Sequence, residues 1–516
     1  MKGREHSGGV PNACCGSVHG GDFAGRGAGA FNFRRISSRD TDNRSKKFRV
    51  SKRGAARNPQ NPRPMYNPNI PEPRRPSMRP EGWSRWYVPL RFKFAGVQVL
   101  ALLWVAVSVY ISLPWLHALG RAVSMPAALI IIAGIAYVPG YMNALQLISL
   151  IWDRQPPLRD DDPAEAITLL IAAHNESEVI ATTLEKVAAQ DYAGPMTVMV
   201  IDNASTDDTA AVARKAGRQF GLQIRIVREA TPGKHYALNR GLAEVRTKLV
   251  ATLDADTLLH PQAIRRLVAR YVSAPVGTGS VAGSVLVRNS RSNFLARMQE
   301  WDYFLGIAST KRFQGMYLNT LVAQGAFSLY VTDVVREAGG WPDAIGEDIV
   351  LTWKLLRQGQ RSVFEPTAVA FTEVPTKFRH FSRQRSRWAR GMLEGFRAVK
   401  PWEQPSPMAR YLTGLDVLIP FMDLAYTFCW IPGLALACLG RFYIVGPATI
   451  LVLPLTLAVN FTLYRRQRRV FESLGLRVRR NPTGLVAYVL LYQMMMSPVS
   501  VFGYAQELSR ARRVWQ

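Results

Sequence analysis

Five apolar stretches of membrane length constrain this sequence more than any other feature. They cover residues 94–119, 124–152, 412–439, 442–463 and 485–508. About 20 consecutive apolar residues suffice for a helix to cross the hydrocarbon core of a bilayer, so each stretch is a predicted transmembrane helix. The short loop after the first stretch carries only Arg121, which predicts a helical hairpin. A multi-pass membrane protein is expected, with one large domain between the second and third spans.

Basic residues near the spans indicate their orientation. An arginine-rich run at 465–469 marks a cytoplasmic loop, so the basic side of the membrane is expected to face the cytoplasm. The expected location is the inner membrane of the cell. An odd number of spans places the C-terminus outside, whereas Arg510, Arg512 and Arg513 favour the inside. The third span contains two carboxylates, Asp416 and Asp423. One interpretation is that both line a polar path, and the other is that both lie near the interfacial end of the helix.

The charge of the chain is concentrated at its N-terminus. Of the formal net charge of +28, about +12 lies in residues 1–86, a stretch rich in Gly, Arg, Asn and Pro. It buries too little apolar surface to offset the entropy of ordering, so we interpret it as a disordered basic tail that attracts anionic lipid head groups. No aromatic interleaving accompanies the charge, and no specific nucleic-acid partner is expected. No cleavable signal peptide is expected, because the first apolar span begins near residue 94.

From residue 166 the pattern changes to short apolar runs that alternate with amphipathic ones. The predicted strands are residues 167–172, 197–201, 223–227 and 249–253, and the predicted helices are residues 179–189, 208–220 and 235–245. Ser205 is the expected N-cap of the middle helix. This order predicts a Rossmann-like α/β domain around a parallel sheet, whose ligands gather at the carboxyl ends of the strands.

Acidic and amide side chains follow three of these strands. Asn175 and Glu176 follow the first, Asp202 the second, and the triplet from Asp254 to Asp256 the fourth, so all are expected at one edge of the sheet. A solvated turn would explain an isolated Asp-x-Asp triplet. After a buried strand of a nucleotide-binding sheet, the two carboxylates can hold one hard cation, Mg2+ or Mn2+, that bridges the phosphates of a nucleotide-sugar. The four cysteines show neither zinc nor disulfide spacing, so any metal uses oxygen ligands.

A second acidic pair, Glu347-Asp348, opens a predicted helix. An acidic first turn complements the helix dipole, and this explanation is sufficient for an isolated pair. The functional hypothesis is that Asp348 accepts the proton of an acceptor hydroxyl as the hydroxyl attacks an anomeric carbon. Upstream, Pro232-Gly233-Lys234 leads into another helix, where backbone amides and Lys234 can approach a nucleotide.

Residues 377–396 combine arginines with aromatic side chains, as an amphipathic helix in the membrane interface does. This role alone would explain Trp388. Arg387 could also stabilise a leaving diphosphate through charge-assisted hydrogen bonds, and Gln384 and Trp388 could contact an acceptor sugar. The two roles are compatible.

From about residue 94 onward, the chain resembles the processive, membrane-embedded family-2 glycosyltransferases, which include poly-N-acetylglucosamine, chitin-oligosaccharide, hyaluronan and cellulose synthases. The motifs that carry this resemblance are Asn175-Glu176, Asp202, Gly233-Lys234 with Leu238-Asn239, Asp254-Ala255-Asp256, Gly325, Glu347-Asp348 and Gln384-Arg385-Ser386-Arg387-Trp388. The resemblance implies an α/β GT-A domain inserted between transmembrane α-helices. It also implies a UDP-sugar donor, Mg2+ or Mn2+, and inversion at the anomeric carbon.

The same resemblance implies a role for each matching residue. The implied donor-binding residues are Asn175, Glu176, Asp202, Lys234 and Asp254, with Asp202 at the uridine. Asp254 and Asp256 would hold the metal and the diphosphate, and Asp348, beside Glu347, would be the catalytic base. The implied acceptor and diphosphate residues are Gly325, Gln384, Arg387 and Trp388. One departure is Asp202-Asn203-Ala204, where family members usually carry a second carboxylate.

These predictions divide the chain into five parts. They are a disordered basic tail at residues 1–86, two transmembrane helices at 87–154, a cytoplasmic GT-A glycosyltransferase domain at 155–375, interfacial helices with the Gln-x-x-Arg-Trp motif at 376–410, and about three transmembrane helices at 411–516. The sequence ends soon after the last span, without room for the cyclic-di-GMP-binding domain of many cellulose synthases. We therefore expect an amino-sugar polymer rather than cellulose.

The predicted function is that of an inverting transferase that polymerises a β-linked, poly-N-acetylglucosamine-like polysaccharide from UDP-sugar and passes it through the membrane. Its expected partners are the donor, the growing polysaccharide, membrane lipids and accessory export subunits. One alternative is a single sugar transfer to a membrane lipid, because ceramide glucosyltransferases resemble the same motif set. A more distant alternative is a catalytically silent membrane scaffold.

Overall fold

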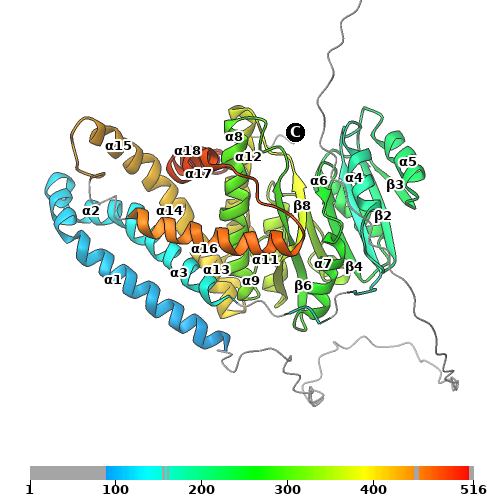
Figure 1. The fold of residues 1–516 in the computed structure, drawn as a ribbon, viewed down its shortest axis with the longest axis horizontal. Helices are drawn as coiled ribbons and strands as arrows, with labels where there is room; N and C mark the ends of the chain where they lie inside the picture. Colours follow the sequence, from blue (N-terminus) through cyan, green and yellow to red (C-terminus); the bar gives the residue numbers. More distant parts are fainter. Residues whose placement is uncertain (1–88, 154–156, 160–161, 447–451, 511–516) are drawn as a thin grey trace, which may run out of the picture. The chain divides into compact units, whose positions relative to one another are not determined.

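A computed structural model describes residues 89–153, 157–159, 162–446 and 452–510. The predicted basic tail at residues 1–86 lies outside these ranges. Eight strands form one mixed sheet in the order β3-β2-β1-β4-β7-β6-β8-β5 (Figure 1). The strands are β1 (Ile167–Ala173), β2 (Met196–Asn203), β3 (Ile224–Glu229), β4 (Leu249–Asp254), β5 (Leu258–Leu259), β6 (Thr278–Val287), β7 (Phe327–Val331) and β8 (Arg361–Thr372).

The first four strands are parallel, as the sequence predicts, and β7 reverses the direction of the sheet. Strand β1 pairs in parallel with β2 and β4, whereas β4 pairs antiparallel with β7. Strand β6 is antiparallel to β7 and parallel to β8. The predicted bounds of β1 to β4 agree with the structure to within two residues. The antiparallel β7 brings the loop that precedes it next to the end of β4.

Helices cover both faces of the sheet. On one face, alternate residues of β1 such as Leu169 pack in one core with α4 (Ile180–Ala188), α5 (Thr209–Phe220) and α7 (Ala263–Ser273). On the other, Leu170 packs with α6 (Lys234–Glu244) and α11 (Glu347–Arg357). The prediction that Ser205 caps the middle helix is wrong. Helix α5 begins at Thr209 with Asp208 as its N-cap, and the Ser205 hydroxyl instead accepts the backbone N–H of Asn175 at 3.1 Å.

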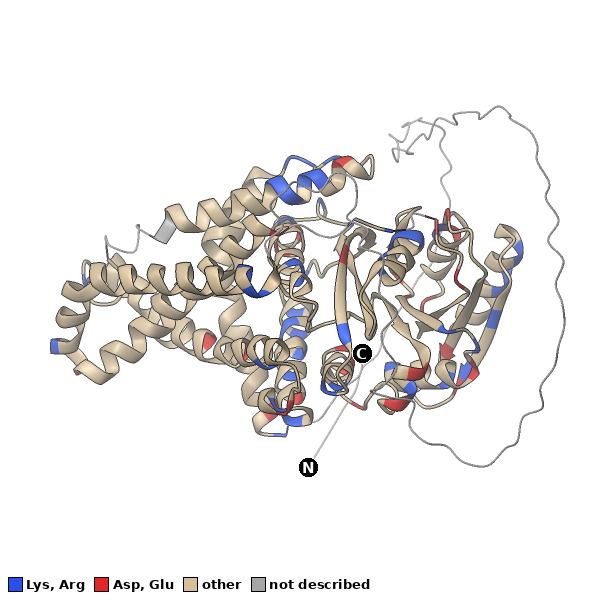
Figure 2. Cartoon of the chain, turned by 90° about the horizontal axis from the view of Figure 1, so that it is seen from below, with Lys and Arg blue, Asp and Glu red and all other residues tan. Residues whose placement is uncertain are grey.

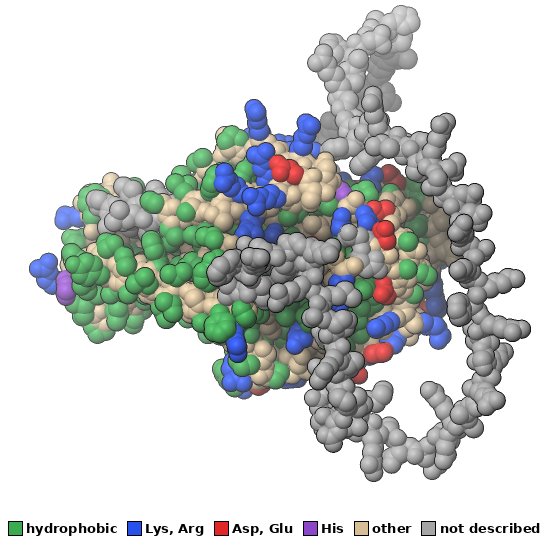
Figure 3. Space-filling model, turned by 60° about the horizontal axis from the view of Figure 1, so that its bottom comes forward, with side chains coloured by type: hydrophobic (Ala, Val, Ile, Leu, Met, Phe, Trp, Pro, Cys, Tyr) green, Lys and Arg blue, Asp and Glu red, His purple; other side chains and the backbone are tan. Residues whose placement is uncertain are grey.

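Four helical segments are long and apolar enough to cross a membrane among the residues described. They are Leu90–Val123 (α1), Met125–Trp152 (α2, η1 and α3), Pro407–Cys438 (α13, α14, η4 and α15) and Pro482–Leu508 (α17, η6 and α18). Hydrophobic side chains gather at the end of the molecule that these segments form, and few charged residues lie there (Figures 2 and 3). The predicted fifth span at 442–463 includes residues 447–451, outside the described ranges. Its second half belongs to α16 (Val452–Ser473), which carries the arginine run.

A layer of helices joins the sheet to the membrane segments. It contains α8 (Phe294–Trp301), η2 (Asp302–Ile307), α9 (Ala308–Met316) and α12 (Phe378–Ala398). One apolar core combines Val97 of α1 and Leu145 of α3 with Phe313 of α9 and Trp353 of α11. The membrane segments therefore pack directly on the helices that carry site residues.

The two carboxylates of the third span have different surroundings. Asp416 lines the cavity described below. Asp423 accepts hydrogen bonds from Ser497 Oγ and Tyr504 Oη, both at 2.8 Å, and so joins α14 (Leu418–Ala425) to α18 (Gln493–Leu508). Asp416 thus lines the cavity, whereas Asp423 joins two helices.

Candidate active site

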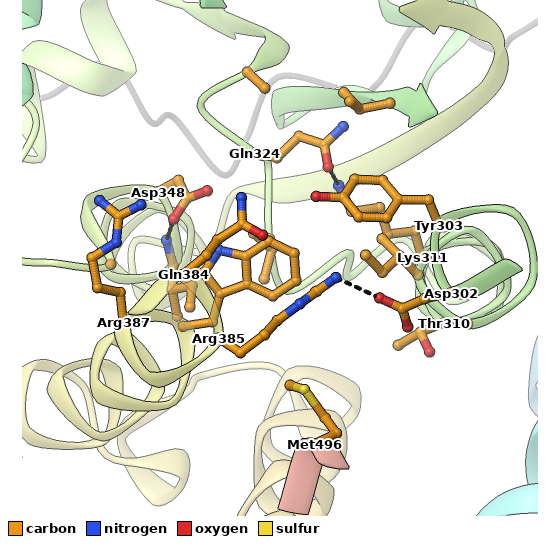
Figure 4. Close-up of a pocket in the computed structure, with 18 of the residues that line it drawn as sticks. Asp302, Tyr303, Thr310, Lys311, Gln324, Asp348, Gln384, Arg385, Arg387 and Met496 are labelled. Atoms are coloured by element: carbon orange, nitrogen blue, oxygen red, sulfur yellow. Dashed lines mark hydrogen bonds and ion pairs between the residues drawn. The ribbon is translucent and has the colours of Figure 1, made fainter. Parts of the chain in front are cut away.

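A cavity of about 1510 Å³ lies between the sheet, α12 and the membrane segments. It is lined by ten of the twelve predicted site residues, namely Glu176, Lys234, Asp254, Asp256, Gly325, Glu347, Asp348, Gln384, Arg387 and Trp388. They come from the loop after β1, the end of β4 and its loop, the loop before β7, and the helices α6, α11 and α12. Figure 4 shows the part of the cavity around Asp348 and Gln384.

Lys234 links the two acidic clusters. At the N-terminus of α6, its Nζ lies 2.6 Å from Asp254 Oδ1 and 3.7 Å from Glu347 Oε1. Burial alone would lower the pKa of Lys234, but the charges of these carboxylates outweigh it and raise the pKa above its ordinary value. The ammonium group therefore stays charged where an anionic diphosphate could lie.

The carboxyl groups at the edge of the sheet are crowded. Burial, followed by the charges of Asp256 and Asp254, raises the pKa of Glu176 to about 7. Burial, followed by the charge of Asp254, raises the pKa of Asp256. Burial also raises the pKa of Glu347, an effect that Lys234 opposes. Such a cluster of carboxyl groups favours the binding of a cation.

The carboxylates at 254 and 256 fit a divalent cation. Both line the cavity after strand β4 and offer only oxygen atoms, the ligands that Mg2+ and Mn2+ prefer. No group of three or more His, Cys, Asp or Glu residues forms a closed metal site within the described ranges. Mg2+ commonly uses only one or two carboxylates together with substrate phosphates and water, so this pair is sufficient.

Asp348 is held by backbone amides. Its Oδ2 accepts the N–H of Gly325 at 3.2 Å, and its Oδ1 accepts the N–H of Ile349 at 2.8 Å. A Cβ on Gly325 would lie 2.9 Å from Lys234 Nζ and 3.5 Å from Glu347 Oε1. A side chain at residue 325 would therefore meet the end of Lys234, which would have to move.

Helix α12 fixes the start of α11 from the other side. Its Glu394 Oε2 accepts the backbone N–H groups of Ile345 at 2.6 Å and of Gly346 at 3.2 Å. Gly346 and Gly391 are in backbone contact, because a Cβ on Gly346 would lie 2.6 Å from the Cα of Gly391. This close approach places Asp348 next to the Gln384–Trp388 motif. The sequence analysis did not single out Glu394.

Arg385 is the second residue that the sequence analysis missed. It is 1% exposed, and its Nη2 lies 2.9 Å from Asp302 Oδ2, an oxygen that also accepts Tyr492 Oη at 2.7 Å (Figure 4). Its guanidinium carbon lies 4.0 Å from the centroid of the Trp388 ring. Arg385 thus fixes the tryptophan through a cation–π contact. The position of Arg385 inside the Gln-x-x-Arg-Trp motif could have indicated a role in the site, whereas no sequence motif contains Asp302.

The predicted motif residues Gln384, Arg387 and Trp388 lie on one side of the cavity. Burial lowers the pKa of Arg387, and the charge of Glu347 opposes this effect. Arg387 therefore lies within the electrostatic field of Glu347. Trp388 is 39% exposed and lines the cavity, where its ring can contact a sugar.

Asn175 and Asp202 do not line the cavity. Asn175 Oδ1 accepts the N–H of Thr206 at 2.8 Å, which ties the loop after β1 to the loop after β2. Asp202 is 8% exposed and lies 3.9 Å from Arg228 Nε. Their donor-binding roles stay predictions.

Asn203, at the departure from the family pattern, has a clear structural role. Its Oδ1 accepts the N–H of Gly233 at 2.8 Å, and its Nδ2 donates to Thr231 O at 2.6 Å. An amide can make both bonds, whereas a carboxylate could not donate the second. Asn203 therefore holds the loop that positions Lys234.

This fold has the GT-A arrangement, in which polar side chains gather at the carboxyl ends of the parallel strands. Residues 163–391 match the family model described as "Glycosyltransferase like family 2", so this part of the chain is a family-2 glycosyltransferase domain. The fold agrees with that of a solved mannosyltransferase from Pyrobaculum calidifontis in complex with GDP-Man and Mn2+. The TM-score is 0.50 at 20% identity, over 74% of this chain and 99% of that chain.

Curated relatives include poly-beta-1,6-N-acetyl-D-glucosamine synthases from staphylococci. The sequence is 32% identical over 240 residues to the synthase of Staphylococcus aureus (strain COL), which is 46% of this chain and 57% of that protein. It is 31% identical over 230 residues to the synthase of Staphylococcus epidermidis, which is 44% of this chain and 54% of that protein. The chain spans little more than half the length of these relatives.

Proposed function

We propose that the protein is an inverting glycosyltransferase that polymerises a β-linked amino-sugar polysaccharide, similar to poly-N-acetylglucosamine, from a UDP-sugar. The observation that carries this proposal is the extent of the cavity, which is lined by Asp254 and Asp348 in the domain and by Trp430 and Gln493 in the membrane segments. The likeness to the staphylococcal synthases supports an amino-sugar product.

The donor is proposed to bind at the edge of the sheet. Asp254 and Asp256 would hold Mg2+ or Mn2+, which when bound neutralises charge on the donor diphosphate. Lys234 lies beside this pair, and Arg387 lines the same cavity, so both can hydrogen-bond the diphosphate as negative charge builds on it. These cationic groups favour departure of UDP.

Asp348 is the proposed base. It removes the proton of the acceptor hydroxyl while that oxygen forms a bond to the anomeric carbon and the bond from this carbon to the diphosphate breaks. The bonding electrons leave with UDP, and attack from the opposite face inverts the configuration. The amides of Gly325 and Ile349 aim the carboxylate, and Trp388 and Gln384 border the space for the acceptor.

The product is proposed to leave through the membrane segments. Asp416 and Gln493 of two membrane segments line the cavity, and so does Asn460 of α16. Polar groups at membrane depth commonly line such paths. In this proposal the five parts of the chain keep the predicted boundaries, the domain at 155–375 is cytoplasmic, and lipids and export subunits are further partners.

The alternative is a single transfer to a membrane lipid, since a lipid could enter the same cavity. To separate the two, the purified protein in lipid nanodiscs is incubated with a panel of UDP-sugars and Mg2+ or Mn2+. UDP release and product length are then measured. A long polymer from one donor is the expected result. A monoglycosylated lipid would replace the proposal with the alternative, and absence of UDP release from every donor would reject both.

A further inference from the structure

Lys311 is a buried lysine in the active-site cavity to which the proposed reaction assigns no role. It lies on α9 with only 6% of its surface exposed and lines the cavity near Asp302 and Tyr303 (Figure 4). No carboxylate of the described ranges lies within ion-pair distance of its Nζ. Instead, Nζ donates a hydrogen bond to Gln324 Oε1.

Gln324 is fixed at both ends of its amide. Besides accepting from Lys311, it donates from Nε2 to the carbonyl oxygen of Gly283 in β6 at 3.1 Å. The amide thus bridges α9 and the sheet. The next residue, Gly325, donates its N–H to Asp348 Oδ2 at 3.2 Å. A continuous path of bonds therefore connects Lys311 to the proposed base.

We propose that Lys311 is a positioning residue, which through Gln324 holds the loop at Gly325 so that its amide aims the carboxylate of Asp348 at the acceptor hydroxyl. This inference rests on the proposed function, in which Asp348 is the base. The loop is also held on its other side, where Ala326 O accepts the backbone N–H of Asp254 at 3.2 Å. A displacement of about 1 Å at a reacting group can cost about a hundredfold in rate.

Stability does not explain a lysine at this position. Burial lowers the pKa of Lys311 to about 7, which the charge of Asp348 opposes, so the surroundings disfavour its charged form. Removing one partner of a buried hydrogen bond costs about 1 to 3 kcal/mol because the other partner stays unsatisfied, a cost that relief of the lysine's desolvation offsets. A methionine would fill the space of this lysine without the desolvation cost. The hydrogen bond to Gln324 is what that replacement would remove.

The decisive variant is Lys311→Met, studied in full-length protein in lipid nanodiscs. With UDP-N-acetylglucosamine and Mg2+, kcat is expected to fall about 10- to 100-fold while the donor KM changes less than about twofold. The thermal midpoint is expected to change little, because the relieved desolvation of the lysine offsets the lost hydrogen bond to Gln324. A fall in thermal midpoint together with an unchanged kcat would show a purely structural lysine and overturn the proposal.

Gln324→Leu tests the path itself. If the two side chains act as one unit, the double variant loses no more kcat than Gln324→Leu alone, and additive losses would contradict the proposal. The matched control is Lys354→Met. Lys354 is another lysine whose pKa burial lowers, but it donates to Ala338 O at 3.4 Å outside the cavity, and its kcat is expected to match the wild type.

A second measurement separates this inference from the proposed function. Amide hydrogen exchange of a peptide covering residues 322–327 needs no catalysis, and it is expected to accelerate in Lys311→Met but not in Lys354→Met. Unchanged exchange would refute the positioning role even in an active enzyme. If exchange is faster in Lys311→Met but the protein releases no UDP from any UDP-sugar, the contact between Lys311 and the loop is supported and the enzymatic proposal is rejected.

Discussion

The substitution Asp348→Asn separates the proposed base from the donor site. Asparagine keeps the shape of the side chain, and its carbonyl oxygen can still accept the N–H of Gly325, which lies 3.2 Å from the carboxylate. It cannot take a proton from a hydroxyl. A positioned general base contributes about 10²- to 10⁴-fold in rate, or about 2.7 to 5.4 kcal/mol at 1.36 kcal/mol per factor of ten. We expect kcat to fall by this factor.

Binding of UDP should hardly change in the same variant. The contacts of Lys234 are with Asp254 at 2.6 Å and Glu347 at 3.7 Å, and neither involves the side chain at 348. We expect UDP affinity, measured by calorimetry in nanodiscs with Mg2+, to stay within about threefold of the wild type, which is less than 0.7 kcal/mol.

Asp333→Asn is the matched control. Asp333 also lies in the first turn of a helix, α10 (Thr332–Glu337), but its side chain is 79% exposed and outside the cavity. This variant should release UDP at the wild-type rate. Wild-type turnover in Asp348→Asn would refute the assigned base. A loss of UDP affinity as large as the loss of turnover would instead place Asp348 in the donor site.

Three further perturbations test other parts of the site. Asp256→Ala, or removal of divalent cations with a chelator, should weaken UDP binding at least tenfold in calorimetry, and Mn2+ or Mg2+ should restore it only in the wild type. Asp302→Ala leaves the guanidinium of Arg385 buried without its carboxylate, which should cost about 3 to 5 kcal/mol of stability and lower the thermal midpoint. Gly346→Ala would put a Cβ 2.6 Å from the Cα of Gly391, so it should cost about 1 to 3 kcal/mol and reduce kcat through displacement of α11.

Each of these predictions has a clear contrary outcome. UDP affinity independent of both the metal and residue 256 would reject the metal assignment. An unchanged thermal midpoint in Asp302→Ala would mean that Arg385 finds another partner. The control for Gly346→Ala is Gly414→Ala, because a Cβ added at residue 414 meets no atom within 4 Å. Equal behaviour of the two alanine variants would reject the close contact of α11 and α12.

The sequence by itself determined the local elements and which residues were candidates for the site. Alternating and continuous apolar runs predicted the bounds of β1 to β4 and α4 to α6 to within two residues. They do so because the spacing of apolar residues follows directly from which faces of a strand or helix are buried. The carboxylates at 254, 256 and 348 were identifiable because they follow a buried strand or open a helix. The four apolar segments were identifiable from length and composition alone.

Tertiary structure alone decided which side chains hold these groups in place. Asp302 and Arg385 are 83 residues apart in sequence, and Ile345 and Glu394 are 49 residues apart, so no periodic pattern connects them. The antiparallel β7 brings the loop at Gln324 against β4, and α9 brings Lys311 to that loop. Contacts of this kind depend on how helices pack over a sheet edge and a membrane segment. A sequence records the residues that make them, but only the folded chain determines that they meet.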